Sequence, residues 1–592
     1  MPAACDLLFT NGVVWRGTGG SSSPERLDVA VTDGVILAVD ADLSSLRGPG
    51  TEVVDLAGGL LHAGFVDAHI HPIQGGLERL SCDLSEGSTV AEYLEIVARY
   101  AAAHPPRGCD ASRAWITGGG WAMSAFPGGT PTAAALDAVE AIRPVFLFNR
   151  DHHGAWANSA ALALAGITAD TPDPADGRIE RLPDGSPSGT LHEGAAKLVA
   201  AVAPDPTPDE EFAALLEAQR YVLSLGITGW QDAIVGDYFG ASDTALVYRR
   251  ALDEGRLLVD VTGALWWDRD RGVEQVPSLV ARREALVTAL GVDARFRLPA
   301  VKIMADGVVE NGTASMLEPY LGPLGEGDHP RGIAFVGGQD LVDAIVALDA
   351  VGFSAHVHVI GDRAVRDALD GFAAARERNG WATPGRHHLA HLQFVHPDDV
   401  ARFAALGVTA NMQALWACNE PQMRELTVPI VGPSRAESQY PFASILRGLA
   451  PAPGGVRGAA AGSESPAPRL CAGSDWPVST PDPWQAIHVA VNRTLPASDP
   501  EFDPEPLLAD EALTLGEALQ AYTAGSAWIT GRGPADPVVD ARGRVARGAG
   551  VIEVGAVADL AATDRDPFAG GVDSIHETTN VGTWVAGRRV HG

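Results

Sequence analysis

Short apolar runs alternate with alanine- and leucine-rich helical stretches through the middle of the chain. This alternation predicts βα units around a parallel sheet, and hence an α/β fold. Nine runs are predicted as strands: 65–69, 145–148, 227–232, 257–265, 300–305, 353–360, 387–392, 408–413 and 470–475. A closed barrel takes eight strands, and the segment from about 73 to 215 is too long for one connection. We therefore predict a (β/α)8 TIM-like barrel over residues 63–535, in which residues 73–215, including the run 145–148, form an inserted α/β subdomain.

The two ends of the chain are also β-rich. Residues 6–15 hold two short apolar runs on either side of Asn11-Gly12, which is a hairpin turn signal. Further strands are predicted at 27–31, 35–39, 558–562 and 581–590. We expect residues 1–62 and 536–592 to form one small β-sandwich domain together. Residues 450–468, rich in Ala, Gly, Pro and Ser, predict a surface loop before the last barrel strand.

Composition narrows the class of protein and its partners. The chain has 592 residues, 46% of them hydrophobic and 20% charged, which is typical of a soluble globular protein. Its net charge of −32 argues against nucleic acid or an anionic membrane as a partner. The five cysteines (Cys5, Cys82, Cys109, Cys418 and Cys471) form no CxxC pair and predict free thiols in a reducing compartment. With no signal-peptide pattern and no run long enough to span a bilayer, the sequence predicts a cytoplasmic protein.

The first barrel strand ends in a His-x-His pair. His69 and His71 lie two residues apart, so on a strand their imidazoles project to the same face. Pro72 follows directly and stops the strand ladder, which leaves the pair at the strand's end. Two neutral imidazoles side by side suit zinc or a similar divalent ion. Two core or surface histidines that happen to fall two apart are the alternative, and the pair by itself does not decide between these interpretations.

Further polar residues follow the predicted strands in order. They are Lys302 on strand 4, His356 and His358 on strand 5, His387, His388 and His391 on strand 6, and Asp475 on strand 8. Each has an ordinary structural explanation: an edge lysine, a hydrogen-bonded core histidine, or an aspartate in a turn. Together they would meet at the C-terminal ends of the strands, where barrels of this kind place their active sites. The ordered set therefore predicts a metal site.

These residues belong to motifs that resemble a known family over nearly the whole chain. The motifs are Gly64-Phe65-Val66-Asp67-Ala68-His69-Ile70-His71, the segment from Asp151 to Leu162, Gly189-Thr190-Leu191-His192-Glu193, the segment from Gly226 to Ala233, Val301-Lys302-Ile303-Met304-Ala305-Asp306-Gly307 and Ala558-Asp559-Leu560. In combination they resemble the amidohydrolase superfamily, specifically the amidohydrolase family 3 branch that contains N-substituted formamide deformylase. The resemblance implies a (β/α)8 barrel, a β-sandwich from both termini and a binuclear metal centre.

The resemblance also implies a role for each site residue. His69 and His71 would bind a first divalent metal, expected to be zinc, together with Asp475. His358 and His391 would bind a second. Lys302 would carry a carboxylated amine that bridges both ions, and burial would favour this modification because only the neutral amine reacts with carbon dioxide. Without it, a one-metal site is expected.

A hydrolytic mechanism follows from this centre. The metal would activate a water for attack on a substrate carbonyl. Asp475 would accept the proton of that water and pass it to the departing amine, so the expected catalytic residues are Asp475, Lys302 and His391.

Other side chains are expected to contact the substrate. His153 and Glu193 of the insert are candidates, and a purely structural role for both stays open. Trp121 and Trp416, with Trp266 and Trp267, are candidates for an apolar pocket, although tryptophans usually serve the core first.

The sequence departs from the family pattern at two positions. Ala390 replaces a glutamate before the strand 6 ligand, and Ala414 replaces a proline after strand 7. Neither change removes a ligand, but both weaken an assignment of formamides as the substrate.

The leading interpretation is a metal-dependent hydrolase of a C–N amide-type bond in a small organic molecule. Decarboxylation or C–C cleavage at the same centre is an alternative. A non-catalytic scaffold is a further one, which the complete ligand set argues against. A homodimer stays open.

Overall fold

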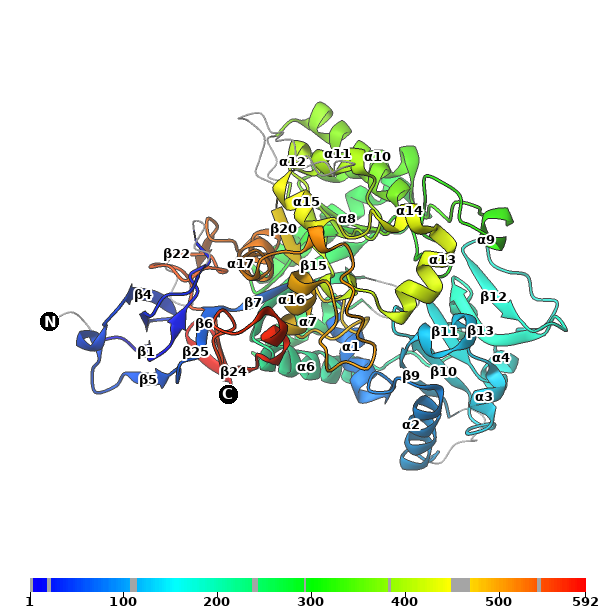
Figure 1. Ribbon diagram of the computed structural model, residues 1–592, viewed down its shortest axis with the longest axis horizontal. Helices are drawn as coiled ribbons and strands as arrows, with labels where there is room; N and C mark the ends of the chain where they lie inside the picture. The colour runs from blue at the N-terminus through cyan, green and yellow to red at the C-terminus, as the bar shows by residue number, and fades with distance from the viewer. Residues whose placement is uncertain are drawn as a thin grey trace.

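An eight-stranded parallel sheet forms the centre of the protein (Figure 1). The computed structural model describes residues 4–18, 23–106, 114–236, 243–291, 294–381, 385–448, 469–539 and 545–592. Its strands are neighbours in chain order: β7 (Phe65–Ile70), β14 (Ile227–Val235), β15 (Asp260–Trp266), β16 (Phe296–Met304), β17 (Ser354–Val359), β18 (His388–His391), β19 (Thr409–Met412) and β20 (Arg469–Ala472). Asp475, just after β20, donates its backbone N–H to the His69 carbonyl on β7 at 2.8 Å. The sheet is thus a nearly closed TIM-like barrel.

Helices alternate with these strands as the sequence pattern predicts. They are α1 (Pro72–Leu80), α6 (Pro208–Ser224), α7 (Ala245–Asp253), α8 (Val276–Leu290), α9 (Pro323–Glu326), α10 (Gly338–Ala350), α11 (Asp362–Asn379), α12 (Pro397–Leu406), α13 (Val428–Val431), α14 (Pro433–Ala436), α15 (Phe442–Arg447), α16 (Pro483–Asn492), α17 (Leu515–Gln520) and α18 (Ser526–Ile529). Helix α6 shows why such segments form. Thr207 and Glu210 make a capping box at its start, and Phe212 and Leu215 bury its apolar face in the barrel core.

A second sheet of six strands lies between β7 and β14 in sequence. Its order is β12 (Gly177–Arg181), β13 (Pro187–Glu193), β11 (Gly154–Ala157), β10 (Val145–Asn149), β9 (Ile116–Trp121) and β8 (Cys82–Asp83). Helices α2 (Val90–Ala103), α3 (Ala133–Asp137), α4 (Ser159–Leu164) and α5 (Ala196–Ala200) accompany it. The run 145–148 is therefore a strand of this separate sheet and not of the barrel. In Figure 1 this sheet lies on the opposite side of the barrel from the chain ends.

The chain ends contribute two small sheets. One contains β4 (Val35–Asp40), β3 (Asp28–Thr32), β1 (Leu7–Thr10) and β5 (Glu52–Asp55). The other joins β2 (Val13–Val14) and β6 (Leu60–Ala63) to β23 (Leu560–Thr563), β24 (Asn580–Val585) and β25 (Arg588–His591). Strands β21 (Pro537–Val539) and β22 (Val545–Arg547) form a third, two-stranded sheet. Strands from both ends of the chain therefore pair directly.

The hairpin predicted at Asn11-Gly12 is wrong. Strand β1 pairs with β3 and β5, whereas β2 pairs with β6 in the other sheet. The chain turns at Asn11, which has a φ of 58°, but it crosses between sheets because Phe9 and Val14 pack into one shared core. A side chain at Gly12 would lie 2.6 Å from the Leu56 Cβ atom, so this crossing requires glycine.

Several predicted strand boundaries also need correction. The strand predicted to end at Asp475 ends at Ala472, so Asp475 follows it, and the run predicted at 581–590 is two strands, β24 and β25. The strand predicted from residue 257 begins at Asp260, because the backbone N–H of Leu258 instead donates to the Gln219 side chain of α6. The strand predicted from residue 300 begins at Phe296 and contains Pro299. A register shift in the β15–β16 ladder opposite this proline accommodates its missing N–H.

Three remaining expectations concern loops, thiols and membrane spans. The loop predicted at 450–468 and Cys109 lie outside the described residues. Cys5, Cys82, Cys418 and Cys471 are buried free thiols. Within the described ranges, every helix is too short or too polar to cross a bilayer.

Candidate metal centre

The barrel brings six polar side chains together at the C-terminal ends of its strands. His69 lies on β7, Lys302 on β16, His358 on β17 and His391 on β18. Asp475 follows β20, and His71 stands directly before α1, whose first residue is Pro72. Strand register accounts for part of the grouping, because Met304 lies opposite His358 and Val359 lies opposite His391.

His69, His71 and Asp475 form the tightest group. The Oδ1 atom of Asp475 lies 3.1 Å from the Nε2 atom of His69 and 3.0 Å from that of His71. One potential ligand atom from each of the three residues falls within 4.8 Å of the others. Burial alone would raise the pKa of Asp475, but the hydrogen-bonded His69 and His71 hold it well below its ordinary value. The carboxylate is therefore ionised and suited to a cation.

Lys302 lies directly beside this group. Its Nζ atom is 3.2 Å from the Nε2 atom of His69, and the residue is 2% exposed. Burial lowers the pKa of Lys302 to about 7, which outweighs the opposing effect of Asp475. A substantial fraction of this amine is thus neutral at pH 7.

His358 and His391 face each other beside the first group. Their ring centroids are 4.4 Å apart, and the His391 ring lies 4.8 Å from that of His69. Burial lowers the pKa values of His358 and His391 well below the ordinary value for histidine, so both rings are neutral. Both ring nitrogens of His391 are buried without a hydrogen-bond partner in the described part of the chain. Because unpaired buried nitrogens are costly, this donor set fits a divalent metal.

Two residues of the cluster and one neighbour have strained backbone conformations. Asp475 has a φ of 57°, His391 a φ of 79° and Leu392 a φ of 56°. L-residues rarely adopt this region, and such strain is retained where the surrounding structure fixes a functional geometry. For Asp475 that support comes from Ser474, whose hydroxyl donates to Asp67 at 2.6 Å.

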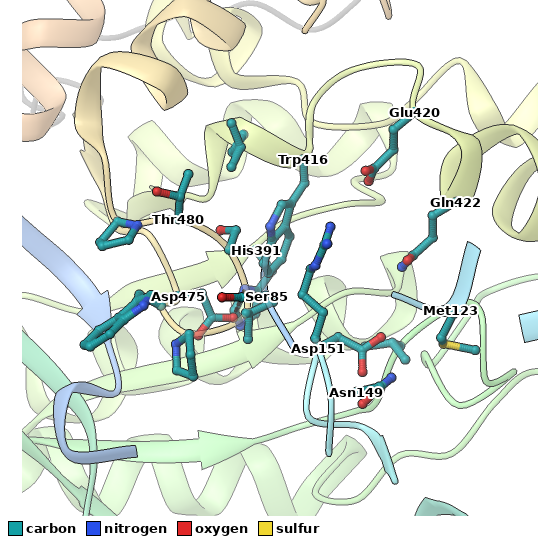
Figure 2. A pocket seen from close by; sticks show the side chains of 18 of the residues that line it. Ser85, Met123, Asn149, Asp151, His391, Trp416, Glu420, Gln422, Asp475 and Thr480 are labelled. Carbon is teal, nitrogen blue, oxygen red and sulfur yellow. Dashed lines mark ion pairs between the residues drawn. The ribbon is translucent and has the colours of Figure 1, made fainter. Parts of the chain in front are cut away.

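A cavity of about 450 Å³ opens above the cluster. His358, His391 and Asp475 line its floor, and Trp416 stacks on the His391 ring with a centroid distance of 5.4 Å and an angle of 13°. Figure 2 shows Glu420, Gln422 and Met123 across the cavity from Asp475. Burial raises the pKa of Glu420 to about 7. The space is large enough for a small organic substrate whose reacting group reaches the cluster.

The insert contributes one wall of this cavity through His153. Its Nδ1 atom lies 2.9 Å from Oε1 of Glu193, which also accepts a hydrogen bond from the Thr313 hydroxyl at 2.8 Å. Burial alone would lower the pKa of His153, but the Glu193 charge and hydrogen bond raise it to about 9. The ring of His153 is 5.6 Å from that of His358. A protonated, fixed imidazole therefore borders the cluster.

The tryptophans divide into three groups. The assignment of Trp121 to the pocket is wrong: it is 1% exposed, and its Nε1–H donates to the Leu147 carbonyl within the core of the six-stranded sheet. Trp266 and Trp267 line a separate cavity of about 240 Å³, which His153 also borders. Trp416 alone among the four lines the 450 Å³ cavity. Trp121 buries its large apolar surface in the core of the insert, and the sequence alone does not reveal this location.

The positions that depart from the family pattern lie next to the cluster. Ala390 is fully buried on β18, opposite His358 in the strand register. Ala414 is also fully buried, two residues before the Trp416 that stacks on His391. Neither alanine occupies the place of one of the six clustered side chains.

His356 was predicted on strand 5 without a role. Its Nε2 atom lies 2.8 Å from the Nδ1 atom of His69, and it is fully buried. Alternation places His356 and His358 on one face of β17, so the sequence signal was present. The two residues differ in their surroundings, because His356 contacts His69 whereas His358 lines the cavity. The sequence alone does not give this difference.

Comparisons with known proteins show the family of the chain. A model of the amidohydrolase family matches residues 52–591. Protein LONG AFTER FAR-RED 3 of Arabidopsis thaliana is 29% identical over 537 residues, which cover 88% of this chain and 83% of that protein. N-substituted formamide deformylase of Arthrobacter pascens is 26% identical over 606 residues, which cover 98% of this chain and 97% of that protein.

A solved structure shares the architecture. The crystal structure of an uncharacterized metal-dependent hydrolase from Pyrococcus furiosus aligns with a TM-score of 0.64 at 25% identity, covering 95% of this chain and 99% of that one. The barrel architecture and the family match over most of the sequence agree with one another. The chain belongs to the amidohydrolase family.

Proposed function

We propose that this protein is a metal-dependent hydrolase that cleaves a C–N amide-type bond in a small organic substrate. The observation that carries the proposal is the cluster of His69, His71, Lys302, His358, His391 and Asp475, of which His358, His391 and Asp475 line a cavity. Similarity to N-substituted formamide deformylase supports the bond type, since that relative aligns over 98% of this chain.

His69, His71 and Asp475 would hold a first metal, and His358 and His391 a second. Neutral imidazoles and an ionised carboxylate favour zinc among the common divalent ions. Such a metal would lower the pKa of a water and polarise the substrate carbonyl. Asp475 would take the proton from the attacking water on a carboxylate oxygen and return it to the departing amine.

Lys302 is proposed to carry a carbamate. Its amine nitrogen would attack carbon dioxide and release one proton, which requires the neutral amine that burial favours. The chain contains two lysines, Lys197 and Lys302, and 41 arginines. Arginine stays protonated and cannot undergo this reaction, so a lysine at this buried position supports the modification.

Substrate contacts are proposed for His153, Glu193 and Trp416. Glu193 would hold His153 so that its Nε2–H faces the cavity as a donor to the substrate carbonyl. Trp416 would supply an apolar wall against His391. We also propose that the two terminal sheets act as one β-sandwich domain of residues 1–62 and 536–592, supported by the buried core that they share.

Metal analysis of purified protein tests the function. The parent is expected to bind about two zinc-like ions after reconstitution with bicarbonate, and Lys302→Ala to lose metal. Lys197→Ala is the matched control, because Lys197 is half-exposed and paired with Asp176 at 3.0 Å. Carbon-13 NMR with labelled bicarbonate should give one carbamate signal that only Lys302→Ala abolishes.

An amide substrate screen would then follow. A parent protein that binds no zinc or manganese in the presence of bicarbonate would overturn the proposal.

A further inference from the structure

A chain of buried polar side chains extends from the metal centre into the barrel. His356 lies 2.8 Å from His69, measured between Nε2 of His356 and Nδ1 of His69. Gln231 on β14 continues the chain, because its Nε2 atom is 3.0 Å from Nδ1 of His356. Gln231 and His356 are both fully buried. Neither residue is among the six that form the cluster.

The geometry defines which ring nitrogen of His69 is open. Its Nδ1 atom is covered by His356, so only Nε2 faces Asp475 and Lys302. A metal at this site must therefore bind Nε2. Neutral imidazole carries one N–H, so a metal-bound His69 must hold its proton on Nδ1 and donate it to His356.

At the Gln231 end of this hydrogen-bonded series, the contacts favour the other tautomer of His69, with its proton on Nε2. His388 donates its Nδ1–H to the Arg386 carbonyl at 3.0 Å, which leaves its Nε2 atom as an acceptor. The Gln231 amide nitrogen lies 3.4 Å from that acceptor and 3.0 Å from the His356 Nδ1 atom. Donation from Gln231 makes Nδ1 of His356 an acceptor, so Nε2 of His356 donates to His69. His69 then carries its proton on Nε2, the atom that a metal needs.

An unpaired atom marks the alternative arrangement. The amide oxygen of Gln231 is buried and has no hydrogen-bond partner among the described residues. When the protons shift for metal binding, Nδ1 of His356 becomes a donor and needs an acceptor. Rotation of the Gln231 amide supplies that acceptor and gives its oxygen a partner, at the loss of the longer contact with His388.

We propose that Gln231 and His356 are positioning residues that set the metal affinity of His69 through this hydrogen-bonded chain. The inference rests on the proposed metal-dependent function. The property that matters in Gln231 is that its amide can present either a donor or an acceptor to His356. Residues that support a metal-binding histidine in this way typically change metal affinity about 10–100-fold when they are removed.

Zinc affinity, measured by competition with a chromophoric chelator, tests the proposal without any substrate. Gln231→Leu keeps the volume but offers no acceptor, so we expect it to bind zinc about 10–100-fold more weakly. Gln231→Glu offers a permanent acceptor and should keep zinc affinity close to that of the parent. Thr262→Val is the matched control. Thr262 is buried on the neighbouring strand β15, and its hydroxyl donates to the backbone carbonyl of Thr530.

The two Gln231 variants separate positioning from simple packing. If packing alone mattered, the buried charge of Gln231→Glu would be at least as harmful as Gln231→Leu. Equal weakening by both variants, or no weakening by Gln231→Leu, overturns the proposal. His356→Phe should weaken zinc binding similarly, and adding Gln231→Leu to it should cost little more, because the two residues act in series. Additive losses of zinc affinity in the double variant would contradict a hydrogen-bonded series in which the two residues act together.

The parent protein separates failure of this inference from failure of the function. A parent that binds no zinc after reconstitution with bicarbonate overturns both proposals. A parent that binds zinc, with Gln231→Leu indistinguishable from it, overturns only the role of Gln231 and His356.

Discussion

Gly473 sets how closely the segment after the last barrel strand approaches His69, a proposed metal ligand. A side chain at this position would lie 2.5 Å from the backbone nitrogen of His69 and 2.6 Å from its Cβ atom. Ordinary contact begins at 3.4 Å, so Gly473→Ala must separate the two segments by about 0.9 Å. Such overpacking costs about 1–3 kcal/mol of unfolding free energy. The displacement moves His69 relative to Asp475, so we expect zinc affinity and catalysis to fall, the latter about 100-fold.

Denaturant unfolding, chelator competition and the rate on a substrate from the amide screen measure these three effects. Gly50→Ala is the matched control, because a side chain there meets nothing within 4 Å. Parental zinc affinity in a folded Gly473→Ala protein would refute the reasoning, since it would mean that His69 keeps its place despite the contact.

Three further predictions concern the core, the cavity and the metal. Burial lowers the pKa of His62 to about 4. The contribution of neutral His62 to the unfolding free energy is therefore fully present above about pH 6.5 and is lost as the pH falls toward 4. Between pH 7.5 and 5 the parent should lose about 2 kcal/mol more than His62→Phe in denaturant unfolding with chelator present, and equal losses would argue against a neutral His62. Trp416→Ala should raise the KM for an amide substrate, whereas Trp121→Ala should leave KM unchanged and cost about 3–5 kcal/mol of stability. Free zinc at 100 times its Kd should stabilise the protein by about 2.7 kcal/mol, and an unchanged melting temperature would contradict a folded-state metal site.

The sequence predicted the barrel because its signals are local. Each strand is a short apolar run, each helix has its own periodicity, and the order of the two defines a parallel sheet. The six residues that the structure brings together stood out in the sequence for the same reason, since a polar side chain within an apolar run is conspicuous. Lys302 is one such residue, and the structure places its amine 3.2 Å from His69.

What the sequence missed depends on long-range packing. Asn11-Gly12 carries a true turn signal, but the partner of β2 is set by a core that strands from both chain ends share. Trp121 is as apolar as Trp416, and only the tertiary structure puts one in a core and the other against His391. His356 and His358 share one face of β17, but His358 lines the cavity as a candidate ligand, whereas His356 contacts His69.

The pairing of β6 with β23 has a consequence for synthesis of the chain. The backbone N–H of Leu60 donates to the Thr563 hydroxyl, a residue 503 positions later. At translation rates of about 5–20 residues per second, β6 waits about 25–100 s on the ribosome before its partner exists. Throughout that time one edge of β6 lies unpaired beside the emerging barrel, which makes it a site where nascent chains can associate and chaperones can bind.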